Sequence, residues 1–145
     1  MKKWLKITLW GVGALICTVI LLLGAFLYLW TTQNERDNRN PAKQTEMKQA
    51  TLEWARLAPF PKEATNFNIK TEGSMFTRSF RGSFSAPKNV IESWIQKSPG
   101  FKDAKIEKID EGIQKYIITP GGGANWAEVT INYLENKVDF YVCWS

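Results

Sequence analysis

The pattern of hydrophobic and polar positions divides the chain into one long uncharged stretch and a series of shorter, alternating ones. Residues 7–30 (ITLWGVGALICTVILLLGAFLYLW) contain no charged side chain. A helix of that length covers about 36 Å at ~1.5 Å per residue, more than the ~30 Å of a bilayer's hydrocarbon core. Trp10, Tyr28 and Trp30 stand near its ends, where aromatic rings favour the headgroup region. We therefore expect residues 1–30 to be a transmembrane signal-anchor helix with a short basic tail, contacting the lipid bilayer through residues 7–30.

Two other interpretations of this stretch fit less well. A cleaved signal peptide has an apolar region of only about 7–15 residues and ends at a small-x-small site, whereas this run is longer and ends in large residues, 27–30 (LYLW). A lipoprotein signal needs a small residue before its cysteine, and here Ile16 precedes Cys17. Whether the segment is ever cleaved is left open by the sequence.

Behind the apolar stretch, residues 31–44 are polar and include Pro41, so we expect a linker, followed by one domain over 45–145. Apolar residues at spacings of three and four predict two helices. The first covers 45–58, with Thr45 as its N-cap and Pro59 after its end. The second covers 87–97 and presents one apolar stripe, made of Val90, Ile91, Trp94 and Ile95.

Alternating apolar and polar residues predict strands in the rest of the domain. We expect strands at 66–71, 75–85, 104–110, 113–119, 125–134 and 138–144, with turns at 72–74, 111–112 and 135–137. The predicted fold class is therefore α+β: an N-terminal single transmembrane helix, then an antiparallel sheet of about five or six strands with one or two helices packed on it. The alternative is a sheet closed into a small barrel.

In the predicted strand 75–85, the sequence leaves open whether the Arg78 side chain faces the core or the surface. Arg78 and Gly82 share the face of Phe76, Phe80 and Phe84. A bulge at Gly82 would change which residues point inward. Arg78 is therefore either a guanidinium at the edge of the core or a displaced surface residue.

More than half of the formal charge of +5 belongs to the membrane segment and its basic tail. Residues 1–30 carry +3, residues 31–40 carry zero, and residues 41–145 carry 14 Lys and Arg against 12 Asp and Glu. Such a domain lacks the concentrated basic charge of a nucleic-acid-binding protein, so no nucleic acid partner is expected. Lys2, Lys3 and Lys6 precede the apolar stretch more closely than Arg36 and Arg39 follow it, which favours a cytoplasmic N-terminus and an extracytoplasmic domain.

The absence of histidine excludes Ser-His-Asp and Cys-His catalysis and His-ligated zinc. Of the two cysteines, Cys17 lies in the apolar stretch and Cys143 in the domain, so no disulfide can close within the domain. An outward-facing domain without disulfides suggests a bacterial envelope. We expect no enzyme activity, cofactor or metal site. The layout resembles that of small single-pass envelope proteins of bacteria, a likeness of architecture that assigns no residue a role.

Two local patterns are candidate catalytic or phosphate-binding sites. The glycine-rich segment 120–124 (PGGGA) leads into a strand and not into a helix, so a connection between strands is favoured over a phosphate-binding loop. The acidic residues Asp103, Glu107, Asp110 and Glu111 alternate with lysines, as on a solvated strand face. They leave a carboxylate-dependent cell-wall or glycoside hydrolase as the alternative function.

Aromatic and arginine residues supply the candidates for binding. Trp54, Trp94 and Trp144 fall on predicted apolar faces and are expected in the core, whereas Trp126 follows the glycine-rich segment. The candidate partner-binding residues are Arg78, Arg81 and Trp126. We expect a membrane-anchored, non-enzymatic interaction module that binds an envelope or membrane protein. A homodimer through small residues of the span, such as Ala14 and Thr18, is possible but not favoured.

Overall fold

The computed structural model describes the backbone of residues 2–73 and 77–145, and the side chains from residue 12 onward except residues 34 and 74–76. The chain forms two compact units, Met1–Asp37 and Asn38–Ser145. Helix α1 (Lys2–Arg39) forms the first unit and supplies the first residues of the second. Within it, Val12–Arg39 is long and apolar enough to cross a membrane, and its apolar side chains from Val12 to Leu29 are exposed.

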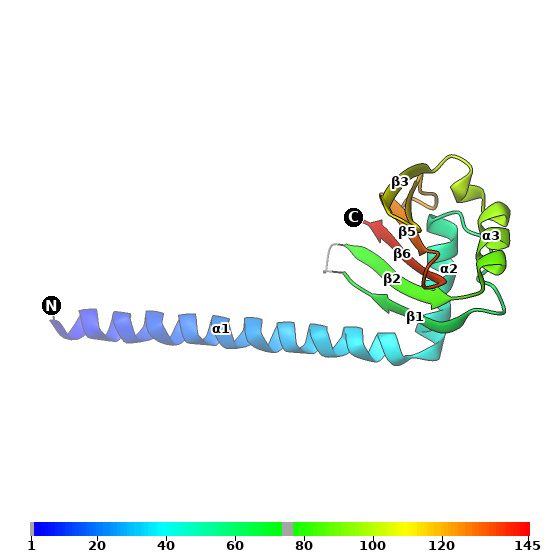
Figure 1. The fold of residues 1–145 in the computed structure, drawn as a ribbon. Helices are drawn as coiled ribbons and strands as arrows, with labels where there is room; N and C mark the ends of the chain where they lie inside the picture. The colour runs from blue at the N-terminus through cyan, green and yellow to red at the C-terminus, as the bar shows by residue number, and fades with distance from the viewer. Residues whose placement is uncertain (1, 74–76) are drawn as a thin grey trace. The chain divides into compact units, whose positions relative to one another are not determined.

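The second unit is an open, six-stranded antiparallel sheet with helices (Figure 1). The strands lie in the order β1-β2-β6-β5-β4-β3. Their bounds are β1 Thr65–Thr71, β2 Arg78–Ser85, β3 Lys105–Asp110, β4 Ile113–Ile118, β5 Trp126–Asn132 and β6 Lys137–Trp144. The predicted α+β class with five or six antiparallel strands is confirmed. The barrel alternative is wrong, because β1 and β3 remain as separate edges.

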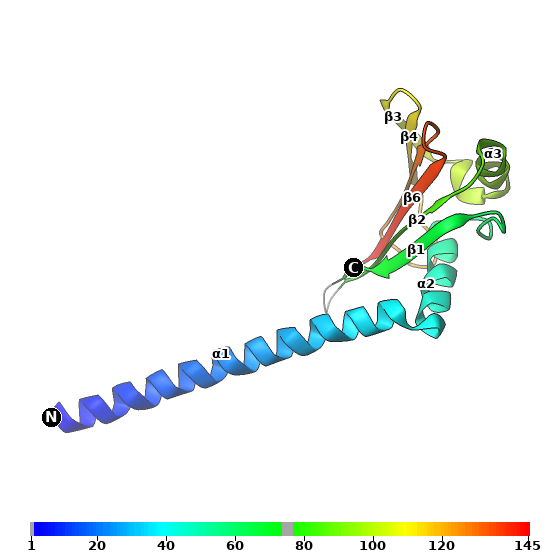
Figure 2. The ribbon, with the colours of Figure 1, turned by 60° about the horizontal axis from the view of Figure 1, so that its bottom comes forward.

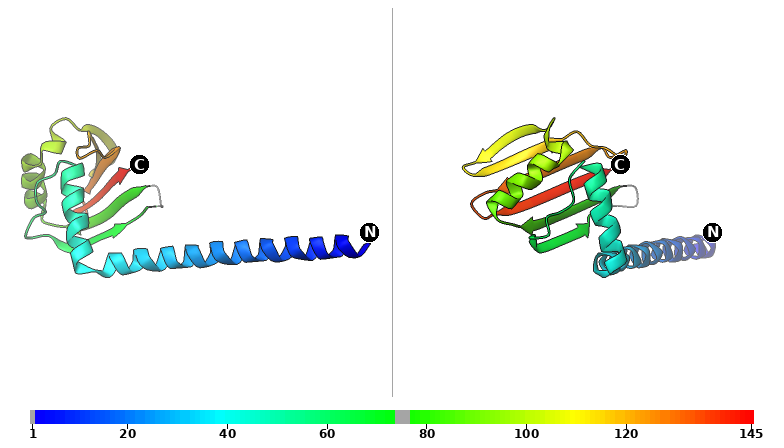
Figure 3. Two further views of the ribbon diagram at one scale, coloured as in Figure 1. Left: turned by 180° about the vertical axis from the view of Figure 1, so that it is seen from behind. Right: turned by 90° about the vertical axis from the view of Figure 1, so that its right-hand side faces the viewer.

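One face of this sheet packs against the helices of the unit. These are α2 (Pro41–Trp54), α3 (Lys88–Lys97) and the short 3₁₀ helix η1 (Pro99–Phe101). Figures 2 and 3 show α2 and α3 on the same side of the strands. The core lies between them and is formed by alternate strand residues, namely Ile69, Phe80, Phe84, Tyr116, Ile118, Ala127, Val129, Ile131, Val138, Phe140 and Val142. Trp94 of α3 meets this layer with its ring 5.3 Å from that of Phe84.

The helix bounds correct two predictions. The 45–58 helix begins earlier, at Pro41, because the Asn40 side chain accepts a hydrogen bond from the Ala42 N–H at 3.0 Å and proline fits the first helical position. Residues 31–44, predicted as a polar linker, are consequently helical on both sides of Asn40. The helix also ends earlier, at Trp54, since Arg56 adopts a left-handed φ of 52°. The 87–97 helix is correct to within one residue, with Pro87 as its N-cap.

The strand predictions hold with small shifts of their ends. The predicted strand 75–85 is regular from Arg78, while Ser74, Met75 and Phe76 lie outside the described residues. No bulge occurs at Gly82, because the β2–β6 register is continuous from Arg78 to Ser85. Gly82 is instead needed for space: a Cβ there would collide with the Phe140 ring and the Asn68 carbonyl oxygen. Register shifts occur elsewhere, in β1 after Thr65 and in β3 after Lys108.

Candidate functional site

The face of the sheet opposite the helices, here called the open face, is polar. Its residues alternate with those of the core along each strand. They are Lys70 of β1, Ser79, Arg81 and Ser83 of β2, Lys137, Asp139, Tyr141 and Cys143 of β6, Trp126, Glu128, Thr130 and Asn132 of β5, Lys115 and Ile117 of β4, and Lys105 and Glu107 of β3. This face is therefore left uncovered by the described helices α2 and α3, which lie on the other side of the sheet (Figures 2 and 3).

Arg81 is fixed on the open face by two neighbours. Its Nε donates a hydrogen bond to Glu72 Oε2 at 2.8 Å, and its guanidinium lies 4.7 Å from the centre of the Tyr141 ring. Lys70 also pairs with Glu72, at 2.7 Å. The hydrogen bonds from Lys70 and Arg81 hold the pKa of Glu72 below its ordinary value. The planar guanidinium is thus stacked and oriented in advance of any binding event.

A second polar group centres on Glu128. Glu128 Oε2 lies 2.7 Å from Lys115 Nζ and accepts a hydrogen bond from the Trp126 indole N–H at 2.9 Å. Burial raises the pKa of Glu128, but hydrogen bonds from Lys115 and Trp126 outweigh burial, so the pKa lies below its ordinary value. The Trp126 ring is held in one orientation although 42% of the residue is exposed.

Tyr141 joins the two groups into one row across the sheet. It pairs directly with Arg81 on β2 and with Glu128 on β5. The structure therefore brings together two of the three predicted binding residues, Arg81 and Trp126, on the same face of neighbouring parts of the sheet. Tyr141 and Glu128 were not predicted, although each occupies a polar position of an alternating strand, which is the signal that could have identified them.

Arg78 does not belong to this surface. It lies on the other face, directly opposite Trp144 at the end of the sheet, and its guanidinium is 4.0 Å from Glu46. Its side chain is 63% exposed and no bulge displaces it, so Arg78 lies at the edge of the core face with its guanidinium in solvent. The strand is regular there, and Arg78 escapes burial because it is the first residue of β2.

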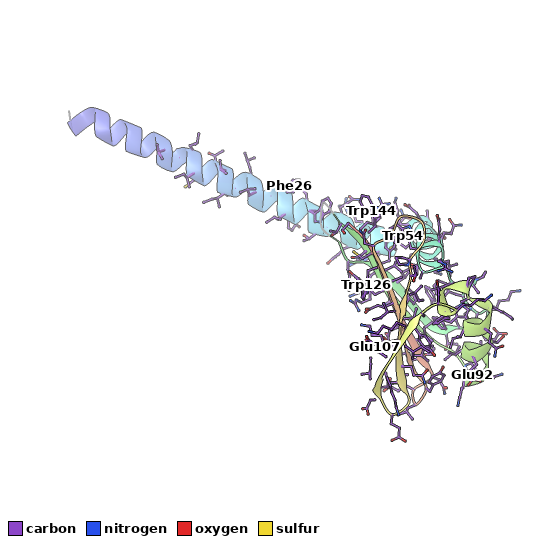
Figure 4. The ribbon with its side chains drawn as sticks, turned by 90° about the horizontal axis from the view of Figure 1, so that it is seen from above. Phe26, Trp54, Glu92, Glu107, Trp126 and Trp144 are labelled. Atoms are coloured by element: carbon purple, nitrogen blue, oxygen red, sulfur yellow. The ribbon has the colours of Figure 1, made fainter. Side chains whose placement is uncertain are left out.

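The three tryptophans predicted in the core have different environments. Trp94 is 3% exposed, and Trp54 is half-buried with its ring stacked 5.3 Å from that of Phe80. The prediction for Trp144 is wrong, because this residue is 46% exposed. Trp144 continues the core alternation of β6, but it is the last residue of the strand and extends past the buried layer that ends at Val142. Figure 4 shows Trp144 and Trp126 at the same end of the sheet.

The acidic residues of the alternative hypothesis occupy separate settings. Asp103 follows η1 and pairs with Arg56 at 2.9 Å, and this hydrogen bond lowers the pKa of Asp103. Glu107 pairs with Lys105 at 3.0 Å on the edge strand β3. Asp110 Oδ1 accepts a hydrogen bond from the Glu111 N–H at 2.7 Å in the following turn. Among the described residues, no three Asp, Glu, Cys or His side chains lie where they could hold a metal ion.

The glycine-rich segment 120–124 is a connection between β4 and β5, as predicted. The Gly121 N–H donates to the Trp54 carbonyl oxygen at 2.8 Å, and Gly122 adopts a left-handed φ of 58° beside the Trp54 ring. A side chain at position 122 would contact that ring at 2.7 Å. The glycines therefore let the loop pack closely against the end of α2.

No known protein family matches this chain, and no curated protein and no solved structure matches it either.

Proposed function

We propose that this protein is a membrane-anchored interaction module without catalytic activity. In this proposal α1 spans the cell membrane with its N-terminus in the cytoplasm, and the second unit lies in the envelope, where the open face binds an envelope or membrane protein. The basic residues Lys2, Lys3 and Lys6 support this orientation. The length and apolar composition of α1 support its insertion.

The observation that carries the binding proposal is the row formed by Arg81, Tyr141 and Glu128, with Trp126 hydrogen-bonded to Glu128 beside it. Arginine, tyrosine and tryptophan are the residue types most enriched among energetically important interface contacts. Here the guanidinium of Arg81 and the indole of Trp126 are each held by a carboxylate, Glu72 and Glu128. Because these side chains are ordered before binding, a partner would recover more of the contact energy.

The arrangement of the carboxylates favours binding over the hydrolase alternative. A glycoside hydrolase needs two carboxyl groups that face one cleft at about 5–10 Å. Asp110 ends β3, whereas Asp103 lies in the turn before the other end of this strand, and the five steps from Lys105 to Asp110 alone cover about 16 Å at ~3.3 Å each. Glu107, between them, is paired with Lys105 on the open face.

A photo-activated cross-linking residue placed in the full chain in native membranes tests the proposal. Asp139 is the test position, because it lies on the open face with 45% of its side chain exposed. Glu92 is the matched control, because its side chain is 50% exposed on α3, and Figure 4 shows it away from Trp126. We expect a discrete adduct from position 139 and none from position 92.

The same experiment with Arg81→Glu or Trp126→Ala should give a weaker adduct from position 139. Adducts of equal strength from both positions would contradict a specific open-face partner. If no adduct forms and Asp110→Asn or Glu111→Gln abolishes a cellular phenotype at normal protein level, catalysis replaces binding as the better account.

A further inference from the structure

The end of the sheet at which the chain enters the second unit, here called the tether end, differs from the opposite end. Asn38 is the first residue of the unit, and its Oδ1 accepts a hydrogen bond from the N–H of Thr71 at 2.8 Å. Thr71 is the last residue of β1. Because all neighbouring strands are antiparallel, β4 and β6 also end here and β2, β3 and β5 begin here.

An exposed tryptophan and an uncharged connection lie at the tether end, beside charged residues that are ion-paired within the unit: Glu72 with Lys70 and Arg81, and Asp103 with Arg56. Trp144 ends β6 and Trp126 begins β5, and the two residues are 46% and 42% exposed. The connection from β4 to β5, residues 119–125 (TPGGGAN), contains no charged side chain. Gly123 of this connection lies beside the Trp144 indole, since a Cβ added to Gly123 would be 4.0 Å from Trp144 Nε1.

The connections at the opposite end of the sheet are charged. They contain Lys62 and Glu63 before β1, Glu111 between β3 and β4, directly after Asp110 at the end of β3, and Glu135 between β5 and β6. Charged connections favour water. The uncharged connection 119–125 therefore differs from the connections at the opposite end in how well it suits contact with water.

The uncharged connection at the tether end is held in place by hydrogen bonds to Arg56 and Trp54. The Arg56 guanidinium donates to the Thr119 carbonyl oxygen at 3.3 Å while it pairs with Asp103, and Gly121 is bonded to Trp54. These bonds within the unit fix the shape of the connection. Trp144 therefore lies next to a surface of small side chains, because residues 121–125 are three glycines, an alanine and an asparagine. This surface presents an exposed indole, and the connection beside it has no charged side chain that would lose its hydration on contact with lipid.

The chain between the apolar stretch and the second unit is short. Residues 31–37 separate Trp30 from Asn38. Seven residues cover about 11 Å as a helix and at most about 25 Å when extended. If Trp30 lies at the headgroup level, the tether end is within reach of the same membrane surface. Tryptophan is enriched at that level because its ring is apolar and its N–H is polar.

We propose that Trp144, together with the uncharged connection 119–125, contacts the lipid headgroup region of the membrane that α1 spans. Arg78, directly opposite Trp144 in the sheet, adds a cation that can meet lipid phosphates. This inference rests on the membrane anchoring in the proposed function, but it does not require the protein partner. It leaves the open face free for that partner, because Trp144 and Arg81 lie on opposite faces of the sheet.

Quenching of tryptophan fluorescence by brominated lipid tests this contact. The full chain, with Trp4, Trp10 and Trp30 replaced by Phe, is reconstituted into phosphatidylcholine vesicles with or without bromine at acyl carbons 6 and 7. The remaining tryptophans are then the four of the second unit. We expect brominated lipid to quench part of the emission, and Trp144→Phe to remove most of that quenching.

Trp126→Phe is the matched control, because Trp126 is similarly exposed on the opposite face, and it should leave most of the quenching in place. No quenching, or quenching that Trp144→Phe does not reduce, overturns the inference. Flotation of the same vesicles separates this failure from failure of the proposed function. A chain that does not float with lipid overturns the anchoring and the lipid contact together, whereas a chain that floats without quenching overturns the lipid contact alone.

Discussion

Trp94 connects three segments of the second unit through a single side chain. Its ring lies 5.3 Å from Phe84 on β2 and 5.5 Å from Phe101 of η1, and its indole N–H donates to the Ala58 carbonyl oxygen at 3.0 Å. Truncation would leave both a cavity and an unpaired carbonyl group. We predict that Trp94→Ala lowers the free energy of unfolding by about 3–5 kcal/mol.

Urea titration of a fragment of residues 38–145 measures this loss. Gln96→Ala is the control, and we expect a change within about 0.5 kcal/mol because Gln96 is exposed on the same helix α3. A loss below about 1 kcal/mol for Trp94→Ala would mean that α3 does not face the sheet as described.

Glu128 makes stability depend on acidity. Its pKa in the folded state lies below the ordinary value, because the bonds from Lys115 and Trp126 outweigh the effect of burial. A carboxyl group with a lowered folded pKa stabilises the fold above its unfolded pKa, about 4.3, and loses that contribution as the pH falls through the folded pKa. We predict that the loss of stability on acidification below about pH 5 is smaller in Glu128→Gln than in the unchanged chain.

Thermal unfolding of the 38–145 fragment, with and without Glu128→Gln, between pH 7 and pH 3 measures this difference in the loss of stability. Glu135→Gln is a suitable control, since Glu135 is exposed in the turn between β5 and β6. Identical pH profiles for the unchanged chain and Glu128→Gln would show that Lys115 and Trp126 do not hold the ionised carboxylate.

At the scale of single residues, sequence alternation predicts the direction of a side chain better than its exposure. Val138, Phe140 and Val142 are buried as their alternation in β6 predicts. Trp144 continues the same alternation but is exposed, because alternation does not show where the covering layer ends. Arg81 and Trp126 could be selected from sequence as residue types, but their shared neighbour Tyr141 depends on strand pairing that no local pattern specifies.

At the scale of elements, the sequence predicts which helices and strands are present better than it predicts where the helices begin and end. Period-two alternation and turn residues identified all six strands, and one face of every strand except the exposed edge strand β3 contributes to the core. The start of α2 was missed because Asn40 and Pro41 lie in a polar segment, and polar composition also suits a linker. At Gly82 the sequence left a bulge open as one alternative, whereas in the structure the missing Cβ makes room for Phe140 from the neighbouring strand.

The cap of α2 gives a prediction at this scale. The Asn40 side chain satisfies the Ala42 N–H, one of the amide groups that a helix start leaves without a partner. We predict that Asn40→Ala costs about 1 kcal/mol of stability in the 38–145 fragment, whereas Asn40→Asp, which keeps the acceptor, costs much less. Chemical denaturation compares the three proteins. Equal stability of Asn40→Ala and the unchanged fragment would show that the cap does not contribute.

At the scale of the whole molecule, the fold class followed from the sequence but the strand order did not. The last strand, β6, lies between β2 and β5, so its partners are distant along the chain on one side. This central position brings Arg81 and Trp126 to the same open face and Trp144 to the tether end. Pairing of distant strands depends on the complete core, which is why the candidate surface could not be located from sequence alone.

The second unit has its own core, and this gives a prediction for the separated part. Its buried residues all belong to Asn38–Ser145. We predict that residues 38–145 fold as a soluble monomer, because their apolar faces enclose one core. Analytical ultracentrifugation and a cooperative unfolding transition check this. Aggregation of a well-purified fragment, or unfolding without a cooperative transition, would show that α1 is required for folding.

The proposed function requires that the second unit lies outside the cytoplasm and that α1 lies in the membrane. Protease added to intact cells whose outer layer has been permeabilised tests this directly, with a cytoplasmic protein as the control for an unbroken inner membrane. We predict that the protease removes residues 41–145 while the cytoplasmic control stays intact, because Lys2, Lys3 and Lys6 hold the N-terminus inside. Full protection of residues 41–145 in intact cells, with digestion only after lysis, would contradict the account and reverse the orientation.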